Sequence, residues 1–138
     1  MRSPVAIAAP LCLALALGGC SLTATPTKKK TLAGAAGKIV TVIDNFSSDA
    51  NDGDASTICD KILSTTLKQH LNSIGGCNTI VTNQLDTVSN FTLTISKYAV
   101  TGNSAEFVVS SNYNGKYKPG TLKFVNQPKG GWRISSLG

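Results

Sequence analysis

Few side chains in this sequence are placed to do chemistry. His70 is the only histidine and no C-x-x-C pair occurs, so a zinc site of the usual ligand composition is not indicated. There is no G-x-S-x-G motif for a nucleophilic serine. The Gly-Gly pairs at 75–76 and 130–131 are typical of turns and lack the spacing of a phosphate-binding loop. We therefore expect no catalytic residue, no metal and no cofactor, and the sequence favours a non-catalytic protein without deciding the point.

Cys20 is the most informative of the four cysteines. It ends the stretch Leu17-Gly18-Gly19-Cys20, which resembles the lipobox of bacterial lipoproteins. Arg2 and the apolar run Val5 to Leu17 precede it; the run is shorter than the roughly 20 residues of a membrane-spanning helix but typical of a signal peptide. The resemblance implies cleavage before Cys20, lipid (diacylglyceryl and palmitate-type chains) on that residue, and a position on the extracytoplasmic face of the bacterial cell membrane. An ordinary secretory signal is the alternative.

Two further cysteines, Cys59 and Cys77, lie in the exported part of the chain, whereas Cys12 lies in the signal peptide. The exported compartment permits disulfides. A bridge between Cys59 and Cys77 would be worth about 3 kcal/mol on the chain-entropy model. We predict this disulfide; two buried free thiols or a metal site are the alternatives.

The lipobox divides the chain into a signal peptide (1–19), a lipid-anchored flexible tether (20–32) and a single α+β domain (33–138). The tether is polar, contains a proline and lacks apolar periodicity. Its run Lys28-Lys29-Lys30 is either a contact for anionic lipid, worth roughly 1 kcal/mol per lysine, or a solvated spacer.

Charge is distributed unevenly along the domain. Residues 31–89 hold three Lys and six Asp, whereas residues 90–138 hold five Lys, one Arg and one Glu. A basic half is a feature of nucleic-acid-binding proteins, but an exported, anchored protein rarely meets nucleic acid. We therefore expect no nucleic-acid partner. The basic half could instead contact anionic lipid, a cell-wall polymer or an acidic protein, or it could simply be a solvated surface.

The first half of the domain has apolar residues at helical spacing. This pattern predicts a long amphipathic helix over residues 33–51 and a second helix capped by Asp54. The pattern then continues to Gly75-Gly76, which ends it. A short last helix is expected to start at Asn78 or Thr79, so the predicted disulfide would join the second helix to the start of the last one.

The second half predicts a β-meander with two-residue turns at Gly102-Asn103 and Asn114-Gly115. Its four strands are expected at Phe91–Thr101, Ser104–Tyr113, Thr121–Asn126 and Gly131–Leu137. With these turns apolar residues lie opposite one another, in the pairs Tyr98–Phe107, Phe107–Leu122, Val100–Ala105 and Ala105–Phe124.

One part of the first strand does not fit this register. Phe91, Leu93 and Ile95 are in the opposite phase, and a shift of one residue moves side chains to the other face. We therefore predict a β-bulge near Ser96-Lys97. The resulting fold is a curved four-stranded antiparallel sheet with the N-terminal helices packed on one face, and a wet, basic second face.

This layout resembles small actinobacterial lipoproteins with a nuclear-transport-factor-like (ketosteroid-isomerase-like) cone domain. The resemblance is carried by the lipobox and by the segments Gly53-Asp54-Ala55, Ile58-Cys59-Asp60, Gly75-Gly76-Cys77 and Gly131-Trp132-Arg133-Ile134. It implies helices curled against a concave sheet, with a pocket in some members, some of which are isomerases or dehydratases. The chain departs from that family because all four of its strands are C-terminal.

Isomerase chemistry of this kind needs a carboxylate base and acid donors in an apolar cavity. The candidates are Asp44, Tyr98 and Tyr113, but Asp44 lies off the apolar stripe of its helix. The favoured function is therefore a non-catalytic binding module for a small apolar ligand or envelope component.

A protein-interaction or structural accessory of a membrane or cell-envelope complex is the alternative function. A cavity of several hundred Å³ would favour the binding module, and a filled core with an exposed apolar patch the accessory. Whether the chain forms a homodimer through its sheet is left open.

Overall fold

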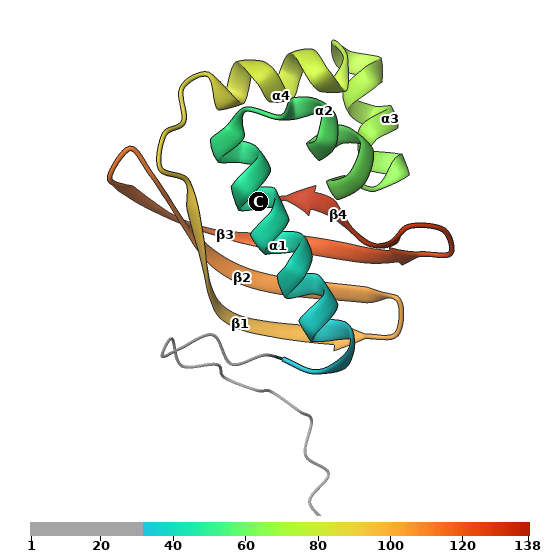
Figure 1. Ribbon diagram of the computed structural model, residues 1–138. Helices are drawn as coiled ribbons and strands as arrows, with labels where there is room; N and C mark the ends of the chain where they lie inside the picture. The colour runs from blue at the N-terminus through green and yellow to red at the C-terminus, as the bar shows by residue number, and fades with distance from the viewer. Residues whose placement is uncertain (1–31) are drawn as a thin grey trace, which may run out of the picture.

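The computed structural model describes residues 32–138, which form a layer of helices on one face of a four-stranded antiparallel sheet (Figure 1). The helices are α1 (Gly34–Asp52), α2 (Ala55–Thr57), the π-helical turn η1 (Ile58–Ile62), α3 (Thr65–Ile74) and α4 (Cys77–Leu85). The strands are β1 (Thr92–Thr101), β2 (Ser104–Tyr113), β3 (Lys116–Gln127) and β4 (Gly131–Leu137). The predicted α+β fold class is confirmed. The predicted signal peptide, Cys20 and the tether as far as residue 31 lie outside the described residues.

Helix α1 lies over the sheet (Figure 1). It packs there through apolar residues that fall on one stripe of the helix. Ile39, Ile43 and Ala50 on this stripe are buried. The helix ends at Gly53, whose φ of 70° is in the left-handed region that favours glycine. The backbone N–H groups of Gly53 and Asp54 then donate to the carbonyls of Ala50 and Asp49, at 3.3 and 2.9 Å.

The helical pattern after Asp54 is interrupted, and the expectation of unbroken helix up to residue 74 is wrong. Leu63 is extended and forms a parallel bridge with Ile134 of β4. The backbone N–H of Ser64 donates to the Ile134 carbonyl at 2.8 Å. Ser64 then caps α3 by accepting a hydrogen bond from the Leu67 N–H at 3.2 Å. The break in the helix therefore lets the chain hydrogen-bond to β4, whose edge would otherwise be unpaired at this point.

Helix α4 starts at Cys77, before the expected Asn78 or Thr79. Its N-cap position is Gly76, which supplies no side chain, at a φ of 93° that favours glycine. The side chain of Asn72 in α3 takes over this role, because its Oδ1 accepts from the Cys77 N–H at 2.9 Å. A cap supplied by another helix is a tertiary contact, which local sequence signals do not reveal.

The sheet has the strand order β1-β2-β3-β4, and its predicted register is confirmed. The four apolar pairs occur as expected: Tyr98–Phe107, Phe107–Leu122, Val100–Ala105 and Ala105–Phe124. The predicted bulge is also present, since the register of β1 shifts between Ile95 and Lys97. The Ser96 hydroxyl of this bulge donates to the Val108 carbonyl at 3.1 Å.

Two features of the sheet were not expected. The pairing of β3 with β4 has a second register shift, between Lys123 and Phe124. Ser135 of β4 is the residue left without a partner in β3. Strand β3 also begins at Lys116 and so includes Pro119, which lies opposite Ser110. Pairing with β4 begins only at Leu122, so this part of β3 has β2 as its single neighbour and tolerates a proline as an edge strand does.

Candidate functional site

The space between the helices and the sheet is filled by side chains. Phe107 and Phe124 are buried and meet edge to face, with ring centroids 5.4 Å apart. Tyr98 stacks on Phe107 at 5.1 Å, and Ile39 and Ile43 of α1 are buried in the same core cluster. The two best-formed hollows of residues 32–138, described below, both lie outside these layers, on the surface.

The residues considered for isomerase chemistry are not brought together. Asp44 is exposed on α1, and Tyr98 and Tyr113 are half-buried in the sheet. The only buried polar or charged side chain of residues 32–138 is that of Ser64, which caps α3. A carboxylate held in an apolar cavity, which such chemistry requires, is therefore missing from the described part of the chain. His70 is exposed on α3.

The described residues contain no group of three or more His, Cys, Asp and Glu side chains that could hold a metal ion. Within residues 32–138 there is also no helix with both the length and the apolar character to cross a membrane.

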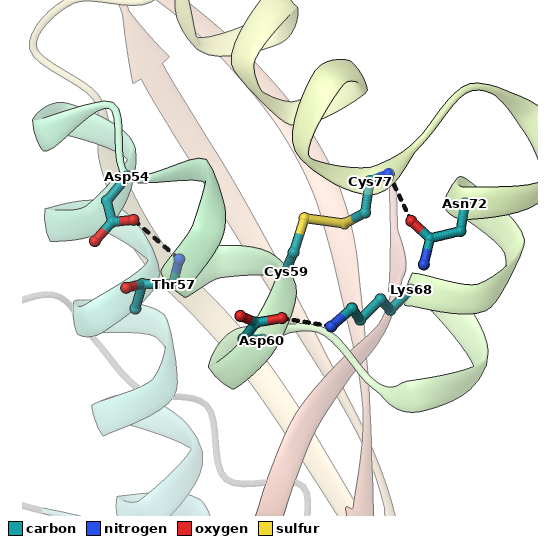
Figure 2. The surroundings of a disulfide bond; sticks show 7 residues. All are labelled: Asp54, Thr57, Cys59, Asp60, Lys68, Asn72 and Cys77. Carbon is teal, nitrogen blue, oxygen red and sulfur yellow. Dashed lines mark hydrogen bonds and ion pairs between the residues drawn. A yellow bond between two sulfur atoms is a disulfide. The ribbon is translucent and has the colours of Figure 1, made fainter.

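The predicted disulfide between Cys59 and Cys77 is present, with Cα atoms 6.1 Å apart (Figure 2). Both cysteines are buried, so the bridge is a structural staple between η1 and the start of α4. Polar contacts surround it: an ion pair between Lys68 and Asp60, and the Asn72 cap on the Cys77 N–H. The staple holds the short elements beside α1 in one arrangement.

Two carboxylates at the end of α1 have shifted pKa values. The Thr57 backbone N–H donates to the Asp54 Oδ1 at 2.9 Å, and this bond lowers the pKa of Asp54. Partial burial raises the pKa of Asp49, and repulsion from Asp54 and Asp52 raises it further. These shifts follow from a helix cap and its crowded acidic neighbours, and neither carboxylate lines a hollow.

The first hollow, of about 340 Å³, lies mainly on the face of the sheet away from the helices, which we call the outer face. It is lined chiefly by small and polar residues: Ala99, Thr101, Ser104, Ala105, Glu106, Lys123, Phe124 and Ser135. The Lys123 Nζ and the Glu106 Oε1 are 3.7 Å apart, and both side chains are exposed. This hollow is shallow and open, and it lies at the end of the sheet near the β1–β2 turn.

The charged side chains of the outer face are three cations and one carboxylate: Lys97, Lys123, Arg133 and Glu106. Arg133 is held in place, because its Nη1 donates to the Asp60 carbonyl at 2.9 Å and its Nε to the Gly130 carbonyl at 3.1 Å. The outer face is thus polar, weakly cationic and left uncovered by the described helices (Figure 1).

The second hollow, of about 500 Å³, lies between the start of α3 and the β3–β4 turn. Two hydrogen bonds join Gln127 and Thr65 here. The Thr65 N–H donates to Gln127 Oε1 at 2.9 Å, and Gln127 Nε2 donates to Thr65 Oγ1 at 3.2 Å. With these groups already paired, the hollow is a weaker candidate for ligand binding than the outer face.

The sequence did not single out two asparagines that fix the loop before β1. Asn51 at the end of α1 donates to the Phe91 carbonyl at 2.8 Å and accepts from the Phe91 N–H at 2.7 Å. Asn114 in the β2–β3 turn donates to the Thr87 carbonyl at 2.6 Å and accepts from the Ser89 N–H at 2.8 Å. The Asn-Gly turn signal located Asn114, but nothing local indicated its partners.

The candidate site is therefore a surface, formed by the outer face of the sheet and the strand ends beside it. No protein-family model matches this chain. No curated protein matches it either.

Proposed function

We propose that this protein is a lipid-anchored, extracytoplasmic accessory of the bacterial cell envelope, and that it docks an envelope protein on the outer face of its sheet. The single observation that carries this proposal is the filled core. Phe107 and Phe124 occupy the region in which a cone-shaped domain would enclose a ligand. With side chains filling the space between helices and sheet in residues 32–138, we infer that the domain acts through its surface.

The proposed location rests on the sequence Leu17-Gly18-Gly19-Cys20 and the short apolar run before it. Cleavage before Cys20 and acylation of its sulfur would anchor the chain far more firmly than a single acyl chain does. The resemblance to small lipoproteins with a cone domain supports the same location. The Cys59–Cys77 disulfide is consistent with an oxidising compartment.

The proposed docking surface is the hollow around Ala99 together with the cations beside it. Lys97, Lys123 and Arg133 against one Glu106 favour a partner with an acidic surface, because complementary charge orients and accelerates protein association. The large exposed hydrophobic side chains of the described residues are Ile74, Tyr117 and Leu137, which lie in three different elements. Docking would therefore be polar and reversible.

The test is photo-crosslinking in the native host, with a photoreactive amino acid in place of Ala99. The matched control carries the same amino acid in place of Asp44, which is exposed on the helical side. We expect one discrete envelope partner from position 99 and none from position 44. The Cys20→Ala chain should lose both membrane association and the crosslink.

Three results would contradict the proposal. The first is no crosslinked partner from position 99, and the second is the same partner from both positions. The third is a product with twice the mass of the chain, which would identify the outer face as a homodimer interface. Unchanged membrane partitioning of the Cys20→Ala chain would contradict the lipid anchor alone.

A further inference from the structure

Just after the turn of the β2–β3 hairpin, β3 begins with an aromatic residue that lies between two lysines in the sequence. We call residues Asn114 to Lys118 the hairpin tip. Tyr117 is 77% exposed although it is a large aromatic residue, and Lys116 and Lys118 beside it are also exposed. In Figure 1 the hairpin extends at the left of the view, beyond the helices. We propose that this tip contacts the anionic headgroups of the membrane that holds the chain.

The chemistry of the tip fits a lipid surface. Tyrosine has an apolar ring and a polar hydroxyl, and it is enriched at the headgroup level of membranes. Lysines near an anionic leaflet are attracted to it. The exposed ring of Tyr117 packs little against the rest of the domain. Insertion at a membrane interface would bury this ring and leave its hydroxyl in contact with water.

The tip is held rigidly, which prepares it for such a contact. The Asn114 side chain bonds to the Thr87 carbonyl and to the N–H and hydroxyl of Ser89, at 2.6, 2.8 and 2.6 Å. The Asn114 N–H donates to the Ser89 carbonyl at 3.0 Å. A preorganised tip loses little conformational entropy when it binds.

The charge of the whole domain favours the same orientation. The sheet half, residues 90–138, has six cationic side chains and one Glu, and the helical half has an excess of Asp. The segment from Cys20 to Thr31 reaches about 40 Å when extended. This is longer than a ten-residue strand, about 33 Å, so an anchored chain can bring either end of its sheet to the membrane.

This contact is separate from the proposed docking surface. The hollow around Ala99 lies beside the β1–β2 turn, whereas the hairpin tip lies at the other end of β2. Contact through the tip would leave the hollow around Ala99, at the far end of the outer face, free for a partner. The inference rests on the proposed anchoring of the chain, and the experiment supplies an anchor chemically so that the two proposals fail separately.

The experiment uses the mature chain, residues 20–138, coupled through the Cys20 thiol to a maleimide lipid in vesicles. Cys59 and Cys77 are paired, so Cys20 is the single free thiol. The chain carries Tyr117→Trp, and the vesicles contain brominated phosphatidylcholine with or without about a third phosphatidylglycerol. We expect the emission from position 117 to be quenched in anionic vesicles and restored by high salt. The unsubstituted chain, whose Trp132 is buried, should not be quenched.

The matched variants separate the tip from net charge. Lys116→Gln with Lys118→Gln should reduce the equilibrium between bound and free tip about 30-fold and abolish quenching. Lys38→Gln with Lys61→Gln removes the same charge from exposed helical positions and should leave quenching in place. Absence of quenching in the Tyr117→Trp chain, or equal loss in both lysine variants, would overturn the inference.

Discussion

Ser64 joins two parts of the fold through a single residue. Its backbone N–H donates to Ile134 of β4, and its hydroxyl caps α3 by accepting from the Leu67 N–H. The apolar spacing on both sides of Ser64 is helical and predicts a continuous helix through this residue. The bond to β4 comes from a residue far along the chain, so no local signal could predict the break.

Replacing Ser64 should show how much its cap contributes to the stability of the domain. We expect Ser64→Ala to lower the free energy of unfolding by about 1 kcal/mol, because the Leu67 N–H loses its acceptor. Urea denaturation followed by Trp132 fluorescence measures this change. Ser48→Ala, at an exposed serine within α1, is the matched control and should be close to neutral. Equal effects of the two changes would show that Ser64 does not act as a cap.

Asp54 should make the stability of the domain depend on pH. Its pKa is lowered in the folded protein by the hydrogen bond from the Thr57 backbone N–H. The ionised carboxylate therefore stabilises the fold above its ordinary pKa, and this contribution is lost as the pH falls through the lowered value. Asp54→Asn keeps a capping oxygen but does not titrate. We expect thermal melts to show the wild type more stable than Asp54→Asn at pH 7 and the difference to shrink toward pH 2. A constant difference would contradict this role.

The strands were predicted more accurately than the helices. Apolar alternation and two-residue turns specify register locally, and they were sufficient to predict the bulge at Ser96. The early start of β3 was missed because Pro119 and Gly120 imitate a loop. The start of α4 was missed because its cap is the side chain of Asn72 in another helix.

The disulfide should matter most to α4. This helix packs on α2, α3 and η1, with the Cys59–Cys77 bridge at its start. We expect Cys59→Ala with Cys77→Ala to lower the free energy of unfolding by about 3 kcal/mol. In hydrogen exchange, amides of α4 should lose protection first, while those of β2 and β3 stay protected. Uniform loss of protection in all elements would contradict a local staple.

At the scale of the whole molecule, the charge difference between the two halves becomes a difference between layers. That outcome could be anticipated, because the basic residues fall in the strands and the aspartates in the helices. The filled core could not be anticipated from the sequence, because the presence of a pocket depends on how the side chains of both layers pack together. In the sequence, Phe107 and Phe124 are equally compatible with lining a cavity and with filling the space between the layers.

A filled core makes a direct prediction about Phe107. We expect Phe107→Ala to lower the free energy of unfolding by about 3–5 kcal/mol, since the site is buried and surrounded by packed side chains. Tyr117→Ala removes an aromatic ring of similar size from an exposed position and should change it by no more than about 0.5 kcal/mol. Chemical denaturation of both variants measures the contrast, and a small effect at Phe107 would indicate a loosely packed interior.

Native mass spectrometry of the chain extracted from its own cell envelope tests the central claim most directly. The claim is that a lipid-anchored domain with a filled core acts through its surface. We expect a mass that corresponds to residues 20–138 with acyl chains on Cys20 and one disulfide, and no small molecule released when the chain unfolds. An unmodified Cys20 would contradict the anchor, and a released small molecule would contradict the filled core and indicate a ligand-binding protein instead.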